Sequence, residues 1–203
     1  GGGGREHAIA WKIAQSPRVS RLYCAPGNAG IAEIAELVPL KATDLDGIVG
    51  FARQEKIDLC FVAPDDPLAL GLVDRLTAAG IRAFGPGKAA AQIEGSKIYA
   101  KNLMKRYHIP TAAYQCFDEP QSALDFIGTA DFPLVVKADG LALGKGVVIA
   151  SDHDQARQAI RDMMVTDRFG AAGRSIVIEQ FLTGPELTVL AFTDGIVIRP
   201  MVA

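Results

Sequence analysis

Residues 134–150 read LVVKADGLALGKGVVIA, two short β-branched runs separated by a glycine-rich loop. The runs predict an antiparallel pair of strands. Glycines let the backbone approach a ligand closely, and free N–H groups together with lysines form a concave site for an anion. The residues concerned are Lys137, Gly140, Gly144, Lys145 and Gly146. We interpret the stretch as a polyphosphate-binding loop, and the alternative is a mobile hairpin tip that carries a lysine.

The loop differs from the common phosphate loop, in which Gly-Lys-Ser/Thr opens a helix. Here Gly144 and Lys145 are followed by Gly146 and a strand. A loop between two strands is instead expected to act as a lid that closes over phosphates after they bind.

Composition limits the class of protein. The chain has 203 residues, of which 49% are hydrophobic, enough for one or two globular domains. A net charge of −2 and a pI of about 5.9 argue against nucleic-acid binding, and no apolar run is long enough to cross a membrane. Three widely spaced cysteines, Cys24, Cys60 and Cys116, predict buried free thiols in a reducing, cytoplasmic compartment.

The first hundred residues alternate strand and helix patterns, which is typical of a parallel sheet covered by helices on both faces. Strands are expected at 22–25, 59–63 and 82–84, and helices at 6–15, 46–56 and 68–79. A turn follows each strand, at 25–30, 64–68 and 84–87. Because ligands bind at the carboxyl ends of parallel strands, we expect the three turns to form one site. Taken singly, each could be only a turn.

The chain opens with four glycines before Arg5. A glycine run that leads into a helix binds phosphate when a strand precedes it. We therefore expect a strand–loop–helix unit whose first strand is missing here, and a terminal expression scar is the alternative. The strand-like last residues likewise lead us to expect a cut at the other end.

After residue 94 the pattern changes. Ser96 is expected to cap a helix that runs to about residue 107. Further strands are expected at 113–117, 175–179, 187–193 and 196–201, and further helices at 121–127 and 152–164. The pair Asp194-Gly195 predicts a hairpin turn between the last two strands.

Residues 179–186 read EQFLTGPE, two carboxylates that flank an apolar pair. In a nucleotide cleft, Phe181 and Leu182 could line adenine, and Glu179 could orient main-chain groups at its edge. Glu186 could accept hydrogen bonds from ribose hydroxyls. The alternative is a strand end with two solvated glutamates.

Taken together, residues 95–97 (GSK), the 137–146 loop and the 179–186 segment resemble the ATP-grasp ligases. Four further segments narrow the resemblance to the phosphoribosylamine–glycine ligases: GGREH at 3–7, PGNAG at 26–30, PDDPL at 64–68 and FGP at 84–86. The resemblance covers the whole chain, in one order and spacing.

The resemblance implies an α/β fold with two domains. Residues 1–94 would be a Rossmann-like parallel-sheet (pre-ATP-grasp) domain, and residues 95–203 a partial ATP-grasp domain. The latter would contain a small α+β lid subdomain at about 113–178, and 179–203 would begin its C-terminal half. The chain would thus be the N-terminal part of the enzyme.

Members of this family make glycinamide ribonucleotide from ATP, glycine and phosphoribosylamine during purine synthesis, through glycyl phosphate. The resemblance therefore implies these small molecules as partners, without nucleic acid or membrane. It implies ATP as the cofactor, together with magnesium or manganese. The resemblance places the ligands of this metal, and most of the glycine site, beyond residue 203. We therefore expect the chain alone to be inactive, with no metal ligand within it.

The resemblance also implies roles for individual positions. ATP binding falls to Lys97, Lys137, Asp139, Gly140, Gly144, Lys145, Gly146, Glu179, Phe181, Leu182 and Glu186. Phosphoribosylamine binding falls to Gly3, Gly4, Arg5, Glu6, Asn28, Gly30, Pro64, Asp65, Asp66 and Pro67.

Two alternatives stay open. The first is another ATP-grasp carboxylate–amine ligase, such as a carboxyaminoimidazole ribonucleotide or carboxylase-type relative, against which residues 5–7 and the 64–68 turn argue. The second is a truncated, non-catalytic nucleotide-binding module.

Overall fold

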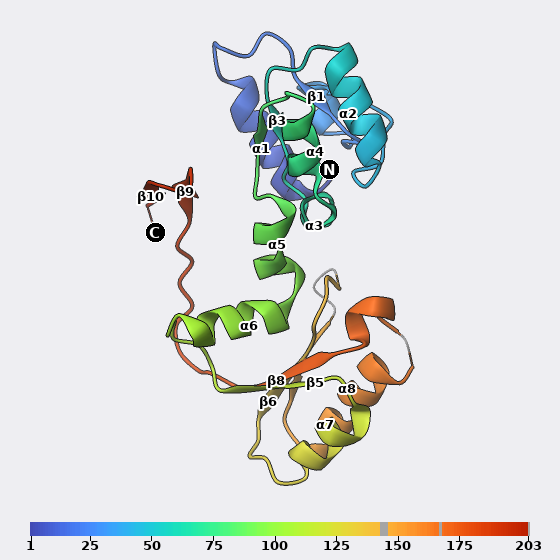
Figure 1. The fold of residues 1–203 in the computed structure, drawn as a ribbon, viewed down its shortest axis with the longest axis vertical. Helices are drawn as coiled ribbons and strands as arrows, with labels where there is room; N and C mark the ends of the chain where they lie inside the picture. Colours follow the sequence, from blue (N-terminus) through green and yellow to red (C-terminus); the bar gives the residue numbers. More distant parts are fainter. Residues whose placement is uncertain (143–145, 167, 203) are drawn as a thin grey trace.

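The computed structural model describes residues 1–142, 146–166 and 168–202 (Figure 1). The elements up to β4 form an N-terminal α/β unit, and a four-stranded sheet with its helices forms a second unit. Helices α5 and α6 lie between the two. Gly144 and Lys145 of the expected phosphate loop lie outside the described residues.

The N-terminal unit contains two parallel strand pairs, β1–β2 and β3–β4. Its elements are α1 (Gly4–Ala14), β1 (Tyr23–Cys24), η1 (Ile31–Glu33), β2 (Glu36–Leu37), α2 (Leu45–Gln54), β3 (Cys60–Phe61), α3 (Asp65–Leu70), α4 (Leu72–Ala78) and β4 (Ala83–Phe84). Parallel pairing is confirmed, but the described strands form two pairs and not one sheet. Gly1 lies between the ends of β1 and β3, because its amino group donates to the Ala25 carbonyl while a Cβ placed on it would meet Pro64.

The single helix expected at 68–79 is wrong, because the chain breaks at Gly71 into α3 and α4. Gly71 has a φ of +92°, a left-handed conformation that glycine adopts without strain, and its N–H closes onto the carbonyls of Pro67 and Leu68. The break lets α4 bury Leu72 and Leu76 in the core of this unit.

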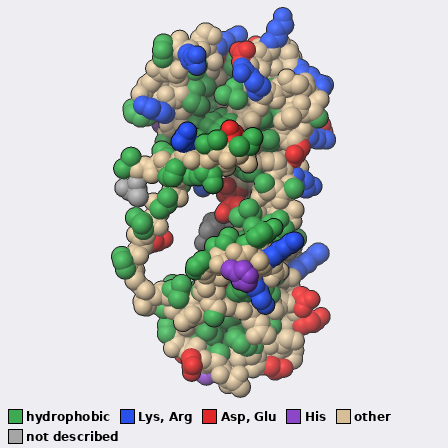
Figure 2. All heavy atoms as spheres, turned by 60° about the vertical axis from the view of Figure 1, so that its left-hand side comes forward, with side chains coloured by type: hydrophobic (Ala, Val, Ile, Leu, Met, Phe, Trp, Pro, Cys, Tyr) green, Lys and Arg blue, Asp and Glu red, His purple; other side chains and the backbone are tan. Residues whose placement is uncertain are grey.

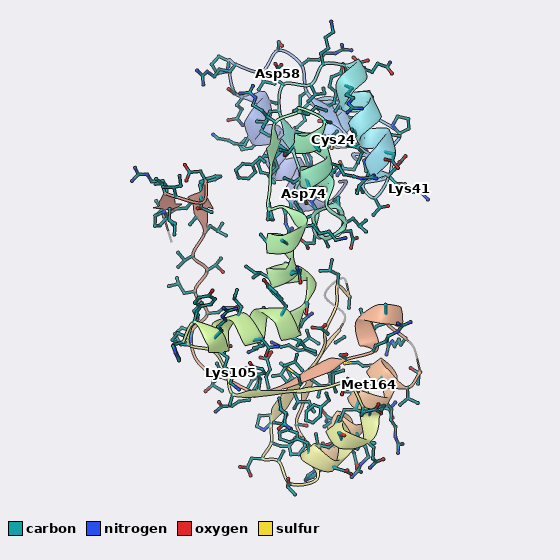
Figure 3. The ribbon with its side chains drawn as sticks, in the orientation of Figure 1. Cys24, Lys41, Asp58, Asp74, Lys105 and Met164 are labelled. Carbon is teal, nitrogen blue, oxygen red and sulfur yellow. The ribbon has the colours of Figure 1, made fainter. Side chains whose placement is uncertain are left out.

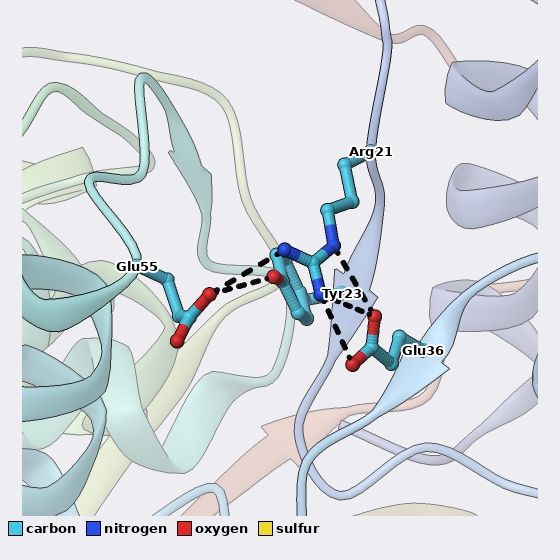
Figure 4. Close-up of polar contacts among 4 residues, drawn as sticks. All are labelled: Arg21, Tyr23, Glu36 and Glu55. Atoms are coloured by element: carbon cyan, nitrogen blue, oxygen red, sulfur yellow. Dashed lines mark hydrogen bonds and ion pairs between the residues drawn. The ribbon is translucent and has the colours of Figure 1, made fainter.

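A polar cluster joins β1, β2 and the end of α2 (Figure 4). Arg21 pairs with Glu36 at 3.0 Å and with Glu55 at 3.6 Å, and the Tyr23 hydroxyl donates to Glu55 at 2.9 Å. The guanidinium carbon also lies 4.7 Å from the centre of the Tyr23 ring. This cluster holds the end of α2 against the β1–β2 pair.

The second unit is an antiparallel sheet in the order β5-β8-β6-β7. Its elements, with the linking helices, are α5 (Lys88–Gly95), α6 (Lys97–Arg106), β5 (Tyr114–Phe117), α7 (Pro120–Ile127), β6 (Leu134–Ala138), β7 (Val147–Ala150), α8 (His153–Met164), η2 (Gly170–Gly173) and β8 (Ile176–Gln180). The expected antiparallel pair is confirmed as β6–β7. Helix α5, an alanine-rich segment, was not predicted.

Alternation along the strands gives this sheet two different faces. Val136 of β6 and Ile178 of β8 point into the main core, which α7 and α8 cover. Lys137 and Glu179 are their sequence neighbours and therefore point to the other face, over which α6 lies (Figure 1). The sheet thus presents charged groups toward α6.

The chain ends in an arm, residues 181–202. Its hairpin pairs β9 (Ala191–Thr193) with β10 (Ile198–Pro200), and the expected turn is confirmed by Gly195, whose φ is +91°. The strand expected from 187 begins only at 191. The arm exposes many apolar side chains and stands away from the body (Figure 2), although the Phe192 ring centre lies 6.0 Å from that of Phe84.

The cysteines are free, but all three are half-buried and not buried as expected, because each lies on a short or edge strand. Burial still raises the pKa of the Cys60 thiol. Among the described helices, none is long and apolar enough to cross a membrane.

Candidate functional site

A cavity of about 460 Å³ lies between the two units, and both contribute to its wall. It is lined by Gly3, Gly4, Arg5, Glu6, Pro64, Asp65, Asp66, Glu94, Lys97, Leu141, Ala142, Gly146 and Val147. Most of these are residues that the sequence predicted for the amine substrate or for ATP. Glu94 and Val147 were missed, although each adjoins a predicted motif, and Leu141 and Ala142 lie inside the predicted loop without having been singled out.

The N-terminal wall of the cavity is built on the starts of α1 and α3. The Gly3 N–H donates to Glu6 at 2.6 Å, which closes the first turn of α1. The Arg5 guanidinium donates to the Asp65 carboxylate at 3.2 Å and to the Ala63 carbonyl at 3.4 Å. An arginine, two aspartates and a helix N-terminus therefore share one wall, a set that can bind both a phosphate and sugar hydroxyls.

Three expected substrate residues lie behind this wall and not on it. Asn28 donates to the Gly2 carbonyl at 2.9 Å, and Gly30 packs against the His7 ring, where a Cβ would come within 2.5 Å. Pro67 is fully buried. The 25–30 turn therefore supports the glycine segment, while the 64–68 turn reaches the cavity through Pro64, Asp65 and Asp66.

The opposite wall is built where β6 ends against the start of α6. Ser96 caps α6 as predicted, accepting from the Tyr99 N–H at 3.0 Å. Asp139 accepts from the Ile98 N–H at 2.7 Å, and the Lys97 ammonium donates to the Gly140 carbonyl at 3.2 Å. Burial lowers the pKa of Lys97, and Asp139 and Glu94 partly oppose this effect. The ammonium group of Lys97 is thus held at the cavity, and the nearby carboxylates offset only part of the cost of burying its charge.

Lys137 and Glu179 lie beside this wall, joined in an ion cluster. Oε2 of Glu179 lies 3.0 Å from Nζ of Lys137 and 3.2 Å from Nζ of Lys101. Glu179 therefore pairs with two lysines, Lys101 of α6 and Lys137 of β6. Lys101 was missed because a single lysine in a helix carries no signal in the sequence.

The structure does not bring Phe181, Leu182 and Glu186 to the cavity. They follow β8 in the extended arm, where Leu182 is 62% exposed and Glu186 is exposed. Their proposed contact with adenine and ribose stays a prediction. Within the described parts of the chain, no group of three or more His, Cys, Asp or Glu side chains could hold a metal ion.

Comparison with known families identifies the family of the chain. Residues 1–94 match the model of the phosphoribosylglycinamide synthetase N domain, and residues 95–203 match that of its ATP-grasp (A) domain. The chain belongs to the phosphoribosylglycinamide synthetase family. The resemblance found in the sequence is thereby confirmed for both halves.

Individual relatives agree with this family. The phosphoribosylamine–glycine ligases of Halalkalibacterium halodurans and Pasteurella multocida are 50% and 49% identical over 202 and 203 residues, covering 100% and 99% of this chain. A trifunctional purine biosynthetic protein of Gallus gallus is 48% identical over 204 residues, covering 99% of this chain and 20% of its own length. The chain spans about half the length of the two bacterial ligases, 47% of each.

Solved structures support the same fold. The phosphoribosylamine–glycine ligase of Thermotoga maritima superposes with a TM-score of 0.80 at 30% identity, over 98% of this chain and 47% of its own. An N5-carboxyaminoimidazole ribonucleotide synthetase in complex with ADP has a TM-score of 0.63 at 19% identity, over 88% of this chain and 44% of its own. At that identity the second likeness shows the fold alone. The α/β fold with ATP-grasp architecture is therefore confirmed.

Proposed function

We propose that the intact gene product joins glycine to phosphoribosylamine with ATP and releases glycinamide ribonucleotide, ADP and phosphate. The observation that carries this proposal is the shared cavity. Arg5 and Asp65 of the N-domain wall face the same space as Lys97 of the ATP-grasp wall. A ligase needs such an arrangement because an amine and an activated carboxylate must meet away from water.

The N-domain wall suits phosphoribosylamine. Its phosphate would take the N–H of Gly4 at the start of α1 together with the Arg5 guanidinium. Asp65 and Asp66 would accept hydrogen bonds from the ribose hydroxyls.

The opposite wall suits the phosphates of ATP. Lys97 lines the cavity and Lys137 lies beside it, so the two lysines supply positive charge, and Gly146 adds its backbone to the lining. The glycine carboxylate would take the γ-phosphoryl group, which converts a poor acyl donor into glycyl phosphate. The amine would then form the amide bond while phosphate leaves. The side chains named here supply positioning and charge stabilisation.

We also propose that magnesium or manganese accompanies the ATP. A divalent ion neutralises phosphate charge when it is bound. Because no candidate cluster occurs among the residues that the structure describes, we assign no step of the reaction to a metal held by them.

Product analysis tests the proposal directly. The intact gene product is incubated with ATP, magnesium, glycine and phosphoribosylamine, and ADP and glycinamide ribonucleotide are measured while each substrate is omitted in turn. The proposal predicts that product formation needs both glycine and phosphoribosylamine. ADP formation with bicarbonate and an aminoimidazole ribonucleotide would favour the carboxylase-type alternative. Nucleotide binding without turnover would favour a non-catalytic module.

A further inference from the structure

Two charged residues are buried among those that the structure describes, and they form a pair. Lys101 of α6 is 7% exposed and Glu179 of β8 is 5% exposed, and the nearest charged atoms are 3.2 Å apart. The Lys101 ammonium also donates to Thr111 at 2.7 Å and lies 5.4 Å from the centre of the Tyr114 ring. The Lys101 side chain is thus held by several elements, with no role in the reaction assigned to it so far.

Lys137 reaches the same carboxylate oxygen from a different environment. Its Nζ lies 3.0 Å from Oε2 of Glu179, but its side chain is 27% exposed, against 9% for that of Lys101. One negative charge is therefore shared by two positive charges. The cluster has a surplus positive charge, and Lys137 is its exposed member.

We propose that Lys101 is a positioning residue that frees Lys137 to bind the phosphates of a nucleotide. Lys101 keeps Glu179 neutralised at all times, and Lys137 exchanges Glu179 for phosphate when ATP arrives. The inference rests on the proposed function, since it requires that Lys137 contacts the nucleotide.

The argument follows from the penalty for an unpaired buried charge. A carboxylate left without a partner in a buried site is strongly disfavoured. With Lys101 present, Lys137 can turn to phosphate because Glu179 keeps its other partner. Without Lys101, Lys137 is the one remaining lysine of the cluster, and every phosphate contact that it makes would leave Glu179 unpaired.

The experiment is a double-mutant cycle in the intact gene product. The variants are Lys101→Met, Lys137→Ala and the two combined, and a non-hydrolysable ATP analogue is titrated by calorimetry. Lys105→Met is the matched control: Lys105 is exposed on the same helix (Figure 3), so its loss removes the same charge without touching Glu179. Lys101→Gln is a second variant that can still hydrogen-bond Thr111. Thermal unfolding is recorded for each protein.

We expect Lys101→Met and Lys101→Gln to weaken analogue binding about tenfold, roughly the effect of losing one charge-assisted hydrogen bond. In the Lys137→Ala background, Lys101→Met should weaken binding no further, because the side chain through which it acts is gone. Lys105→Met should leave affinity unchanged. A merely structural role would instead lower affinity equally in both backgrounds.

Three results with the variants would overturn the inference. The first is an equal loss of affinity in both backgrounds, and the second is unchanged affinity in a folded Lys101→Gln protein. The third is a loss of affinity from Lys105→Met equal to that from Lys101→Met. Wild-type protein that fails to bind the analogue at all would refute the proposed function and the inference with it. Normal wild-type binding with unaffected Lys101 variants refutes the inference alone.

Discussion

The Asp139 carboxylate, at the end of β6, accepts a hydrogen bond from the Ile98 N–H in the first turn of α6, at 2.7 Å. The same carboxylate accepts from the Ser96 hydroxyl at 3.0 Å. This contact joins the sheet to the helix that carries Lys97, so one aspartate both caps a helix and sets the position of a cation at the cavity.

Asp139→Ala should therefore affect both stability and nucleotide binding. Losing a capping carboxylate destabilises a protein by about 1 kcal/mol. Asp152→Ala is the matched control, because Asp152 caps α8 by accepting from the Gln155 N–H at 2.9 Å but is not among the residues that line the cavity. Denaturant unfolding should show a similar loss in both variants, and nucleotide titration should show weaker binding only for Asp139→Ala. Weaker nucleotide binding in both variants would contradict the prediction, because the loss of affinity would then follow from lower stability and not from the position of Lys97.

Gly140→Ala should destabilise the second unit. A Cβ at Gly140 would lie 2.8 Å from the Ala172 Cβ and 2.9 Å from its Cα, and neither can move without moving the backbone. Overpacking of this kind destabilises by about 1–3 kcal/mol. Gly50→Ala in α2 meets nothing within 4 Å and should instead stabilise by up to about 1 kcal/mol through helix propensity. The prediction fails if denaturant unfolding gives the two substitutions the same sign.

Lys97→Met should raise stability at neutral pH. Burial holds the pKa of Lys97 below its ordinary value of 10.5, so between the folded and unfolded pKa values the unfolded state binds more protons. The destabilisation by charged Lys97 is therefore complete below the folded pKa and disappears as the pH rises past 10.5. The gain from Lys97→Met should shrink accordingly in urea unfolding at increasing pH, while nucleotide binding weakens at neutral pH. A gain in the free energy of unfolding that grows with pH would contradict the prediction.

Local signals predicted much of the fold. The β6–β7 pair, the Ser96 cap and the Asp194-Gly195 turn each depend on a few adjacent residues, and each is found where expected. The break at Gly71 was missed, because a glycine inside a helical pattern can either be tolerated or end the helix, and here packing decides.

The site was predicted unevenly for a related reason. Arg5, Asp65 and Lys97 lie in motifs with strong local character, and they line one cavity. The roles of Lys101 and Glu179 depend on α6 crossing the sheet, a contact between residues 78 positions apart by number that no local pattern encodes. Burial of a charged pair is visible only in three dimensions.

We propose that one cavity binds the amine substrate on one wall and the phosphates of ATP on the other. Steady-state kinetics of two variants separate these walls. Asp65→Ala removes a predicted ribose acceptor and the partner of Arg5, and Lys137→Ala removes a predicted phosphate donor. Asp46→Ala is the control, since it breaks a similar surface ion pair, with Arg75 at 2.8 Å, away from the cavity.

The deciding measurement is the KM for phosphoribosylamine and the KM for ATP in each variant of the intact gene product. We predict that Asp65→Ala raises the KM for phosphoribosylamine about tenfold and leaves that for ATP nearly unchanged. Lys137→Ala should show the reverse, and Asp46→Ala should change neither. If Asp65→Ala instead raised the KM for ATP while phosphoribosylamine kinetics stayed normal, the assignment of the two walls would be contradicted.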